Sequence, residues 1–382
     1  MYTAIRPLLV ALLVPTALAA QATTETGGFV VRLGKDTIAV ERYTRTADRL
    51  EGDFVTRGQL TVTRHYVVTL GADGSVLRFE GTSRPVGAAA APTTLATATF
   101  RGDSAIVEIK RGDSTQTLRL ATAAPAVPFL NNSFALYELA ARRAHPVPGG
   151  QPAPVALVPL GAPQAFPATV ARLGVDSVAL LIPPQQAPYR LRVDAAGRIV
   201  GATGRGTTQQ VAVERVASLD VAALAAAWAT KPLGTLSPRD TVRATVGGAS
   251  LTVDYSRPAV RGREIFGNVV PWNQVWRTGA NAATIFTTSA DLDRGGTTIP
   301  AGSYSLWTIP SPSGWMLIIN KNTGQWGTEY DVKYDLVRLD MQVQALAQPV
   351  EQFTIAIEPQ GAGGVLKMAW EKTQVSLPFT KK

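Results

Sequence analysis

The chain has 382 residues, a formal net charge of +9 and no cysteine. The absence of cysteine excludes disulfides, thiolate metal sites and thiol nucleophiles. Hydrophobic residues make up 46% and charged residues 17%, which is typical of globular proteins and argues against disorder. No segment concentrates lysine and arginine, so we expect no nucleic-acid partner despite the positive charge.

The first twenty residues have the pattern of a secretory signal peptide. Arg6 precedes an apolar stretch from Pro7 to Leu18, and Ala17-Leu18-Ala19 fits the small-x-small rule for cleavage. The apolar stretch is shorter than the ~20 residues that a membrane-spanning helix needs. We therefore expect residues 1–20 to be a signal peptide that directs export to the periplasm or the exterior, with no transmembrane anchor.

Residues 21–218 predict an antiparallel β domain. From residue 27, short alternating segments flank turns such as Gly34-Lys35-Asp36 and the Arg-Gly-Asp tripeptides at 101–103 and 111–113. The segments 32–40 (RLGKDTIAV) and 68–79 resemble 172–180 (RLGVDSVAL) and 191–202 in the same order, which indicates two similar units. Such a domain forms either a curved sheet or an open barrel.

Two helices interrupt this β pattern. Asn132 is placed to cap a helix from about Ser133 to Ala144, and LDVAALAAAWAT predicts another at about 219–230. KPLGTLSP follows, rich in turn residues, so we assign 219–238 to a helix and linker at the domain boundary. Every tryptophan except Trp228 lies beyond this linker.

Residues 239–382 predict a β-sandwich of about seven to nine strands, so the fold class is all-β. Turn signals separate the segments of strand length. These segments are Ala249–Tyr255, Thr284–Thr288, Gly302–Ile309, Trp315–Asn320, Gln352–Glu358 and Val365–Glu371.

Four motifs give the C-terminal part a family resemblance: TVDYSRPAVRGREIFGNVVPWNQVWRTGANAAT, IPAGSYSLWTIP, WMLIINKNTGQWG and WEKTQVSLP. Over about 237–378 they resemble the bacterial family called domain of unknown function 2911. The resemblance implies an exported bacterial protein with an all-β domain, and no established activity, substrate or cofactor. The family usually has Glu after the Asn of its GAN turn, whereas this chain has Ala282. The preceding β domain lies outside the resemblance.

Arginines and tryptophans cluster within these motifs. Guanidinium groups bind carboxylate or phosphate in a bidentate fork and stack on aromatic rings. Among the other tryptophans, Trp307, Trp315 and Trp370 fit core positions in strands, whereas Trp326 lies in a loop. The candidate ligand-binding residues are Arg277, Asn281, Trp272, Trp276, Arg261, Arg263 and Trp326. The partner expected from them is a glycan or an anionic small molecule.

The same residues also have a structural interpretation. A buried arginine must be paired, and the acidic stretch GTEYDVKYD offers partners for Arg277. In that case Arg277 holds the turn, and the chain is a structural or protein-interaction module of the cell envelope. The acidic candidates for this pairing are Glu329, Asp331 and Asp335.

Catalysis has little support in the sequence, and we assign no catalytic residue. The chain has two histidines, His65 and His145, and it lacks the HExxH, GxSxG, Walker and dinucleotide motifs, so we expect no metal and no cofactor. Paired carboxylates leave a glycan hydrolase as a second alternative, because such enzymes use two carboxyl groups across a cleft. The candidate pairs are Asp254 with Glu264, and Asp331 with Asp335.

Overall fold

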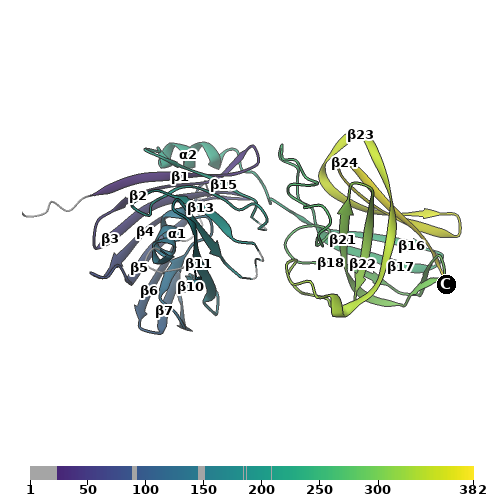
Figure 1. Cartoon of the computed structure of the whole chain (residues 1–382), viewed down its shortest axis with the longest axis horizontal. Coiled ribbons are helices and arrows are strands. Elements are labelled where there is room, and N and C mark those ends of the chain that lie inside the picture. The colour runs from purple at the N-terminus through teal and green to yellow at the C-terminus, as the bar shows by residue number, and fades with distance from the viewer. Residues whose placement is uncertain (1–23, 88–92, 145–150, 184, 186, 208) are drawn as a thin grey trace, which may run out of the picture.

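The described part of the chain forms two β-sheets joined by a short helix and a linker (Figure 1). The structure is a computed structural model that describes residues 24–87, 93–144, 151–183, 185, 187–207 and 209–382. The expected signal peptide and His145 lie outside the described residues. We call the parts that form the first and second sheets the N-terminal and C-terminal domains.

The first sheet has fifteen strands in the described residues, and the first and last of them pair near its middle. Its order runs from β8 back to β1, then from β15 back to β9, and every neighbouring pair is antiparallel except the parallel pair of β9 and β10. The strands are β1 (Glu25–Leu33), β2 (Asp36–Arg45), β3 (Arg49–Arg57), β4 (Thr61–Leu70), β5 (Val76–Pro85), β6 (Thr94–Arg101), β7 (Ser104–Arg111), β8 (Ser114–Ala121), β9 (Ala126–Phe129), β10 (Ala153–Pro159), β11 (Phe166–Gly174), β12 (Ser177–Leu181), β13 (Tyr189–Val193), β14 (Ile199–Thr203) and β15 (Ala212–Val216). The prediction of a curved antiparallel sheet is confirmed.

The internal resemblances correspond to hairpins of this single sheet. The matching segments 32–40 and 172–180 form the hairpins β1–β2 and β11–β12. The segments 68–79 and 191–202 form β4–β5 and β13–β14. Both Arg-Gly-Asp tripeptides are hairpin turns, in which Gly102 and Gly112 adopt φ of 57° and 58°. Such positive φ angles are required by the tight turns that match the twist of antiparallel strands.

A buried carboxylate of the sheet holds the start of α1 (Phe134–Ala141), which lies in the hollow of the sheet (Figure 1). Glu41 on β2 accepts hydrogen bonds from the Tyr66 hydroxyl (2.7 Å), the Ser133 hydroxyl and the Ala135 N–H (2.9 Å). The prediction that Asn132 caps this helix is wrong. The helix begins after Ser133, and the Glu41 carboxylate satisfies a free N–H of the first turn, where the helix dipole favours negative charge.

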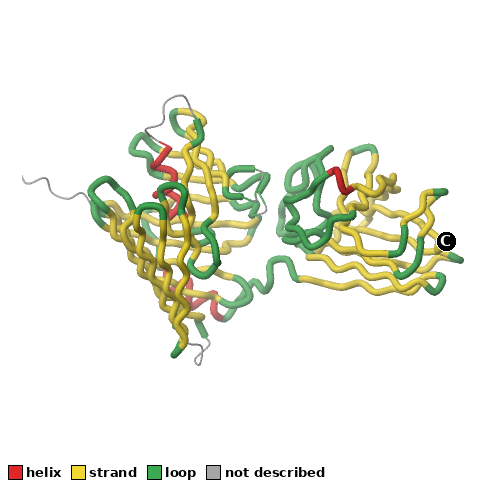
Figure 2. The backbone as a smooth tube through the Cα atoms, turned by 90° about the horizontal axis from the view of Figure 1, so that it is seen from below, coloured by secondary structure: helices red, strands yellow, loops and turns green. Residues whose placement is uncertain are grey.

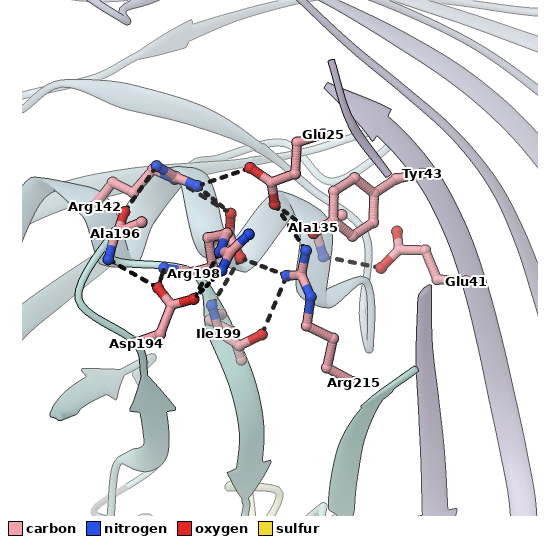
Figure 3. Close-up of polar contacts among 11 residues, drawn as sticks. Glu25, Glu41, Tyr43, Ala135, Arg142, Asp194, Ala196, Arg198, Ile199 and Arg215 are labelled. Atoms are coloured by element: carbon pink, nitrogen blue, oxygen red, sulfur yellow. Dashed lines mark hydrogen bonds and ion pairs between the residues drawn. The ribbon is translucent and has the colours of Figure 1, made fainter. Parts of the chain in front are cut away.

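The other end of α1 is tied to the sheet by an ion-pair network (Figure 3). Glu138 is buried, and its carboxylate accepts from Arg142 (2.7 Å) and from the Ile199 N–H (2.7 Å). Arg215 on β15 lies 3.4 Å from Glu138 and 2.8 Å from Glu25 on β1. Each buried charge here has an opposite charge, which is the condition under which burial of ions is tolerated.

Burial raises the pKa of Glu41 above its ordinary value of 4.5, although its hydrogen bonds act in the opposite direction. The folded protein therefore holds this proton more tightly than the unfolded chain. The resulting stability is complete below pH 4.5 and is lost as the pH rises through the folded pKa. We predict that the stability advantage of the wild type over Glu41→Gln is largest near pH ~4 and shrinks towards pH ~7.

Urea unfolding of both proteins across this range measures the effect, with Glu108→Gln on the exposed face of β7 as the control. A wild-type advantage that grows with pH would contradict the assignment.

The second sheet folds into a sandwich around one long strand. Residues 335–341 of β23 pair with β22, and residues 342–360 pair with β24, so β23 belongs to both faces. Only its segment Gln352–Glu358 was expected as a strand. The nine strands in the described residues are β16 (Arg239–Val246), β17 (Ala249–Ser256), β18 (Thr284–Thr288), β19 (Leu292–Arg294), β20 (Thr297–Ile299), β21 (Gly302–Ser311), β22 (Gly314–Asn320), β23 (Asp335–Gln360) and β24 (Gly363–Lys381). The all-β prediction with a C-terminal sandwich is confirmed.

The connection between the sheets lies along the N-terminal domain. Helix α2 (Val221–Ala229) packs Trp228 against the sheet, and the Arg57 guanidinium lies 5.7 Å from the Trp228 ring centroid. Arg57 also donates to the Lys231 carbonyl (2.7 Å), which fixes the start of the linker. Over the described residues, no helix combines the length and apolar character that a membrane crossing requires.

Candidate functional site

Six of the seven predicted ligand-binding residues line one cavity of about 320 Å³. Residues of both domains line this cavity, which we call the interdomain cavity. Figure 2 shows the loops of the C-terminal domain that face the N-terminal domain. A second cavity of about 530 Å³ shares Gln210, Val269, Trp276 and Arg277 with it. The six predicted residues are Arg261, Arg263, Trp276, Arg277, Asn281 and Trp326.

The backbone around Arg277 is held by hydrogen bonds that do not involve its guanidinium. Trp276 exchanges both backbone hydrogen bonds with Thr308 on β21, at 2.8 and 2.9 Å. The Thr284 hydroxyl donates to the Thr278 carbonyl (2.7 Å), and the Gly327 N–H donates to the Asn281 carbonyl (2.9 Å). The conformation of the turn is therefore fixed by these hydrogen bonds, without a contribution from the guanidinium.

Gly327 makes room for the stem of Arg277. A Cβ atom at position 327 would overlap with Cδ of Arg277 and with the Asn281 carbonyl oxygen. Any larger residue would displace the arginine stem, so the Trp326-Gly327 pair sets the path of the guanidinium towards the cavity.

The Arg277 guanidinium is part-buried and has no acidic partner among the described residues. Its Nη1 donates to the Gly327 carbonyl (3.3 Å), and its buried Nε has no hydrogen-bond partner. Within the described residues no carboxylate forms a salt bridge with it. Burial lowers the pKa of Arg277 to about 10, so the side chain still carries its charge at neutral pH.

The acidic residues expected to pair with Arg277 are engaged elsewhere. Glu329 accepts from the Trp326 N–H (2.8 Å). Asp331 pairs with Lys333 (2.7 Å), and Asp335 pairs with Arg338 (2.8 Å). The structural interpretation of Arg277 through one of these carboxylates is therefore not realised.

The other two arginines of the cavity are satisfied to different degrees. Arg261 forms a salt bridge with Asp36 of the N-terminal domain (2.6 Å), and its backbone N–H donates to the Glu351 carboxylate (2.9 Å). Nε of Arg261 is buried without a partner. Arg263 donates to the carbonyls of residues 259 and 260, at 2.6 and 3.0 Å, and burial lowers its pKa.

The two domains meet where the turn of the first hairpin touches Arg261. The Lys35 N–H donates to the Arg261 carbonyl (3.0 Å), beside the salt bridge of Asp36. Gly34 has φ of 60°, and a Cβ atom there would overlap with the same carbonyl oxygen. This turn was predicted as a hairpin turn, and its contact with the other domain was not foreseen.

The tryptophans divide into core and cavity residues. Trp276 is 8% exposed, and its ring lies 5.1 Å from Phe353 and 5.8 Å from Trp370. Trp326 is 39% exposed and presents its ring at the cavity. Trp272 is the predicted residue that lies away from the cavity, because its ring stacks on Phe266 at 5.9 Å.

The N-terminal domain adds amide side chains that sequence reasoning missed. Asn131, Gln209 and Gln210 line the cavity together with the arginines. No local pattern marks them, because their approach depends on how the two domains dock. A pair of adjacent glutamines in a loop carries no signal of its own.

The described residues considered for catalysis do not line the interdomain cavity. Asp254 pairs with Arg239 (2.7 Å). His65 lies on an exposed part of β4, and its ring is 2.9 Å from the Asp53 carboxylate. Among the residues that the structure describes, no group of three or more histidine, aspartate or glutamate side chains is arranged to hold a metal ion.

We predict that replacing two tryptophans of the cavity lowers stability to very different extents. Trp276→Ala removes a buried ring from the aromatic core and should lower the free energy of unfolding by about 3–5 kcal/mol. Trp326→Ala removes a partly exposed ring and should cost less than about 1 kcal/mol. Urea denaturation of both variants checks this, and equal losses would refute the division into core and cavity residues.

Comparison with known proteins identifies the C-terminal part. No curated protein matches the chain. Two solved structures are distantly similar: a DUF1089 family protein from Pseudomonas aeruginosa (14% identity, TM-score 0.36, 45% of this chain and 92% of that chain) and a β-barrel-like DUF1849 protein from Brucella abortus (12%, 0.31, 50% and 94%). Likenesses this remote carry no argument about this chain. Residues 237–379 match the family described as protein of unknown function DUF2911, so the C-terminal part of the chain carries that domain.

Proposed function

We propose that the protein binds a small anionic ligand in the interdomain cavity, with Arg277 as its anchor. The observation that carries this proposal is a part-buried guanidinium whose buried Nε has no partner and which forms no salt bridge with any described residue. Burying a charge without an opposite charge is costly, and an anion in the cavity would remove that cost.

The charge of the cavity wall supports an anion. Three arginines and no carboxylate are among the described residues that line it. In a site of low dielectric, fixed positive charge attracts an anion more strongly than in water. The volume of about 320 Å³ lies at the lower end of the range of ~300–1,000 Å³ for small-molecule sites.

The alternative of a purely structural Arg277 has less support. The turn is fixed by the backbone pairing of Trp276 with Thr308 and by the bond from Gly327 to Asn281. The guanidinium adds one hydrogen bond of 3.3 Å to these contacts. A single long hydrogen bond does not offset the desolvation of a buried charge.

The substitution Arg277→Met separates binding from structure. Methionine keeps most of the stem and removes the charge, so we expect the melting temperature of the free protein to stay the same or rise. We expect the wild type to be stabilised by an anion from a panel of acetate, glucuronate, phosphate and sulfate, because a ligand at a hundred times its Kd adds about 2.7 kcal/mol. The variant should lose this gain.

Thermal unfolding and isothermal titration measure both effects, with Arg243→Met on exposed β16 as the matched control. A fall of several degrees for Arg277→Met, with no anion effect in the wild type, would support the structural module instead.

We also propose that the protein is exported, on the basis of the pattern of its first twenty residues. Expressed in a bacterial host, the full chain should appear in the periplasmic or extracellular fraction in a form shortened at its N-terminus. A variant without residues 2–20 should stay in the cytoplasm. Fractionation with mass spectrometry tests this, and a full-length wild-type chain retained in the cytoplasm would refute it.

A further inference from the structure

We infer that the ligand is an acidic saccharide, a sugar unit with one carboxylate of the uronic-acid type, bound by groups from both domains. This inference rests on the proposed anion site at Arg277 and names the ligand class of that site. It is carried by the three arginines at the cavity, by amide groups on its lining that form no side-chain hydrogen bond with a described residue, and by the exposed indole ring of Trp326.

The partners of the three cavity arginines leave Arg277 as the one without a carboxylate or a close carbonyl partner. The Arg261 guanidinium pairs with Asp36 (2.6 Å). Arg263 donates to the carbonyls of residues 259 and 260, at 2.6 and 3.0 Å. Arg277 has one hydrogen bond, of 3.3 Å, and no carboxylate partner among the described residues. A carboxylate matches one guanidinium in charge and in its forked geometry.

The polar groups around the anchor are amides rather than further charges. Gln209 from the N-terminal domain and Asn281 from the C-terminal domain line the cavity, and neither side chain forms a hydrogen bond with a described residue. Each amide offers both donors and an acceptor. Hydroxyl groups, which also donate and accept, are the natural partners of such amides, and a sugar ring carries several of them.

Trp326 supplies a flat apolar face beside these amides. Trp326 is 39% exposed and lines the cavity, so its indole ring offers a ligand an apolar surface and an N–H donor. A pyranose has an apolar face of C–H groups and a polar edge, so it can lie on the ring while its hydroxyls reach the amides. The wall therefore matches a sugar in shape and in polarity.

The two domains act together in this site. The hairpin turn of Gly34 and Lys35 docks on Arg261, and Gln209, Asn281 and Trp326 line the cavity between the two domains. Gln210 donates to the Thr207 carbonyl (2.9 Å), which holds the glutamine loop in place. A ligand that contacts both walls would stabilise the docked arrangement, since it binds the folded and docked state alone.

Isothermal titration of the full chain tests the ligand class. The probes are glucuronate and a galacturonic acid trimer, with acetate, phosphate, glucose and a glutamyl dipeptide as comparisons. We expect a uronate to bind at least tenfold more tightly than acetate, and glucose to show no binding. Gln209→Ala and Trp326→Ala should each weaken uronate binding about tenfold and leave acetate binding unchanged, whereas Arg277→Met should abolish both.

Matched substitutions elsewhere serve as controls: Gln116→Ala on exposed β8 and Tyr334→Ala, which is 40% exposed, should leave uronate binding unchanged. Equal binding of acetate and uronate, both lost in Arg277→Met, would overturn the saccharide inference and leave the anion site standing. Tighter binding of phosphate or of the glutamyl dipeptide would also overturn it. If no anion binds and Arg277→Met behaves as the wild type in every titration, both the saccharide and the anion site fall.

Discussion

The contact between the first hairpin turn and Arg261 is the constraint on which the two-domain arrangement depends. Lys35 donates to the Arg261 carbonyl, Asp36 pairs with the guanidinium, and Gly34 has no side chain that would push the two apart. Arg261 itself adopts φ of 52°, a conformation that L residues adopt rarely and that the bond from its N–H to Glu351 supports. This contact and the hydrogen bond from Gln210 to the Val269 carbonyl (3.5 Å) join the two domains beside the interdomain cavity.

Buried ionisable groups have several polar partners at α1 in the N-terminal domain, whereas Arg277 in the C-terminal domain has one in the described part of the chain. In the N-terminal domain, Glu41 accepts three hydrogen bonds, and Glu138 has two arginines within salt-bridge distance. These groups tie α1 to the sheet, so their burial serves the fold. Arg277 has no such compensation in the described residues, since no carboxylate pairs with it and its buried Nε has no hydrogen-bond partner. An uncompensated charge at a cavity is a feature that a fold does not need for its own stability.

Local features could be predicted from the sequence, and features that depend on distant parts of the chain could not. The hairpins around Gly102 and Gly112 follow from turn chemistry within four residues. The cap of α1 was assigned to Asn132, because a carboxylate from β2 cannot be recognised by proximity in the chain. The pairing of Arg277 with the nearby acidic stretch failed for the same reason. Those carboxylates have closer partners. The arginines and tryptophans of the cavity could be predicted from the sequence because they cluster along the chain, whereas the amides of the N-terminal domain could not.

The Trp326-Gly327 pair shows how stability and binding are combined at one place. Gly327 lets the arginine stem pass, and Trp326 keeps 39% of its surface open beside the guanidinium. Neither choice favours the free protein, since an exposed indole and an unpaired buried charge both leave stabilising contacts unmade. Natural proteins retain such costs where activity requires them. The coincidence of both costs with three arginines and several amides around one cavity is therefore best explained by a ligand that compensates them.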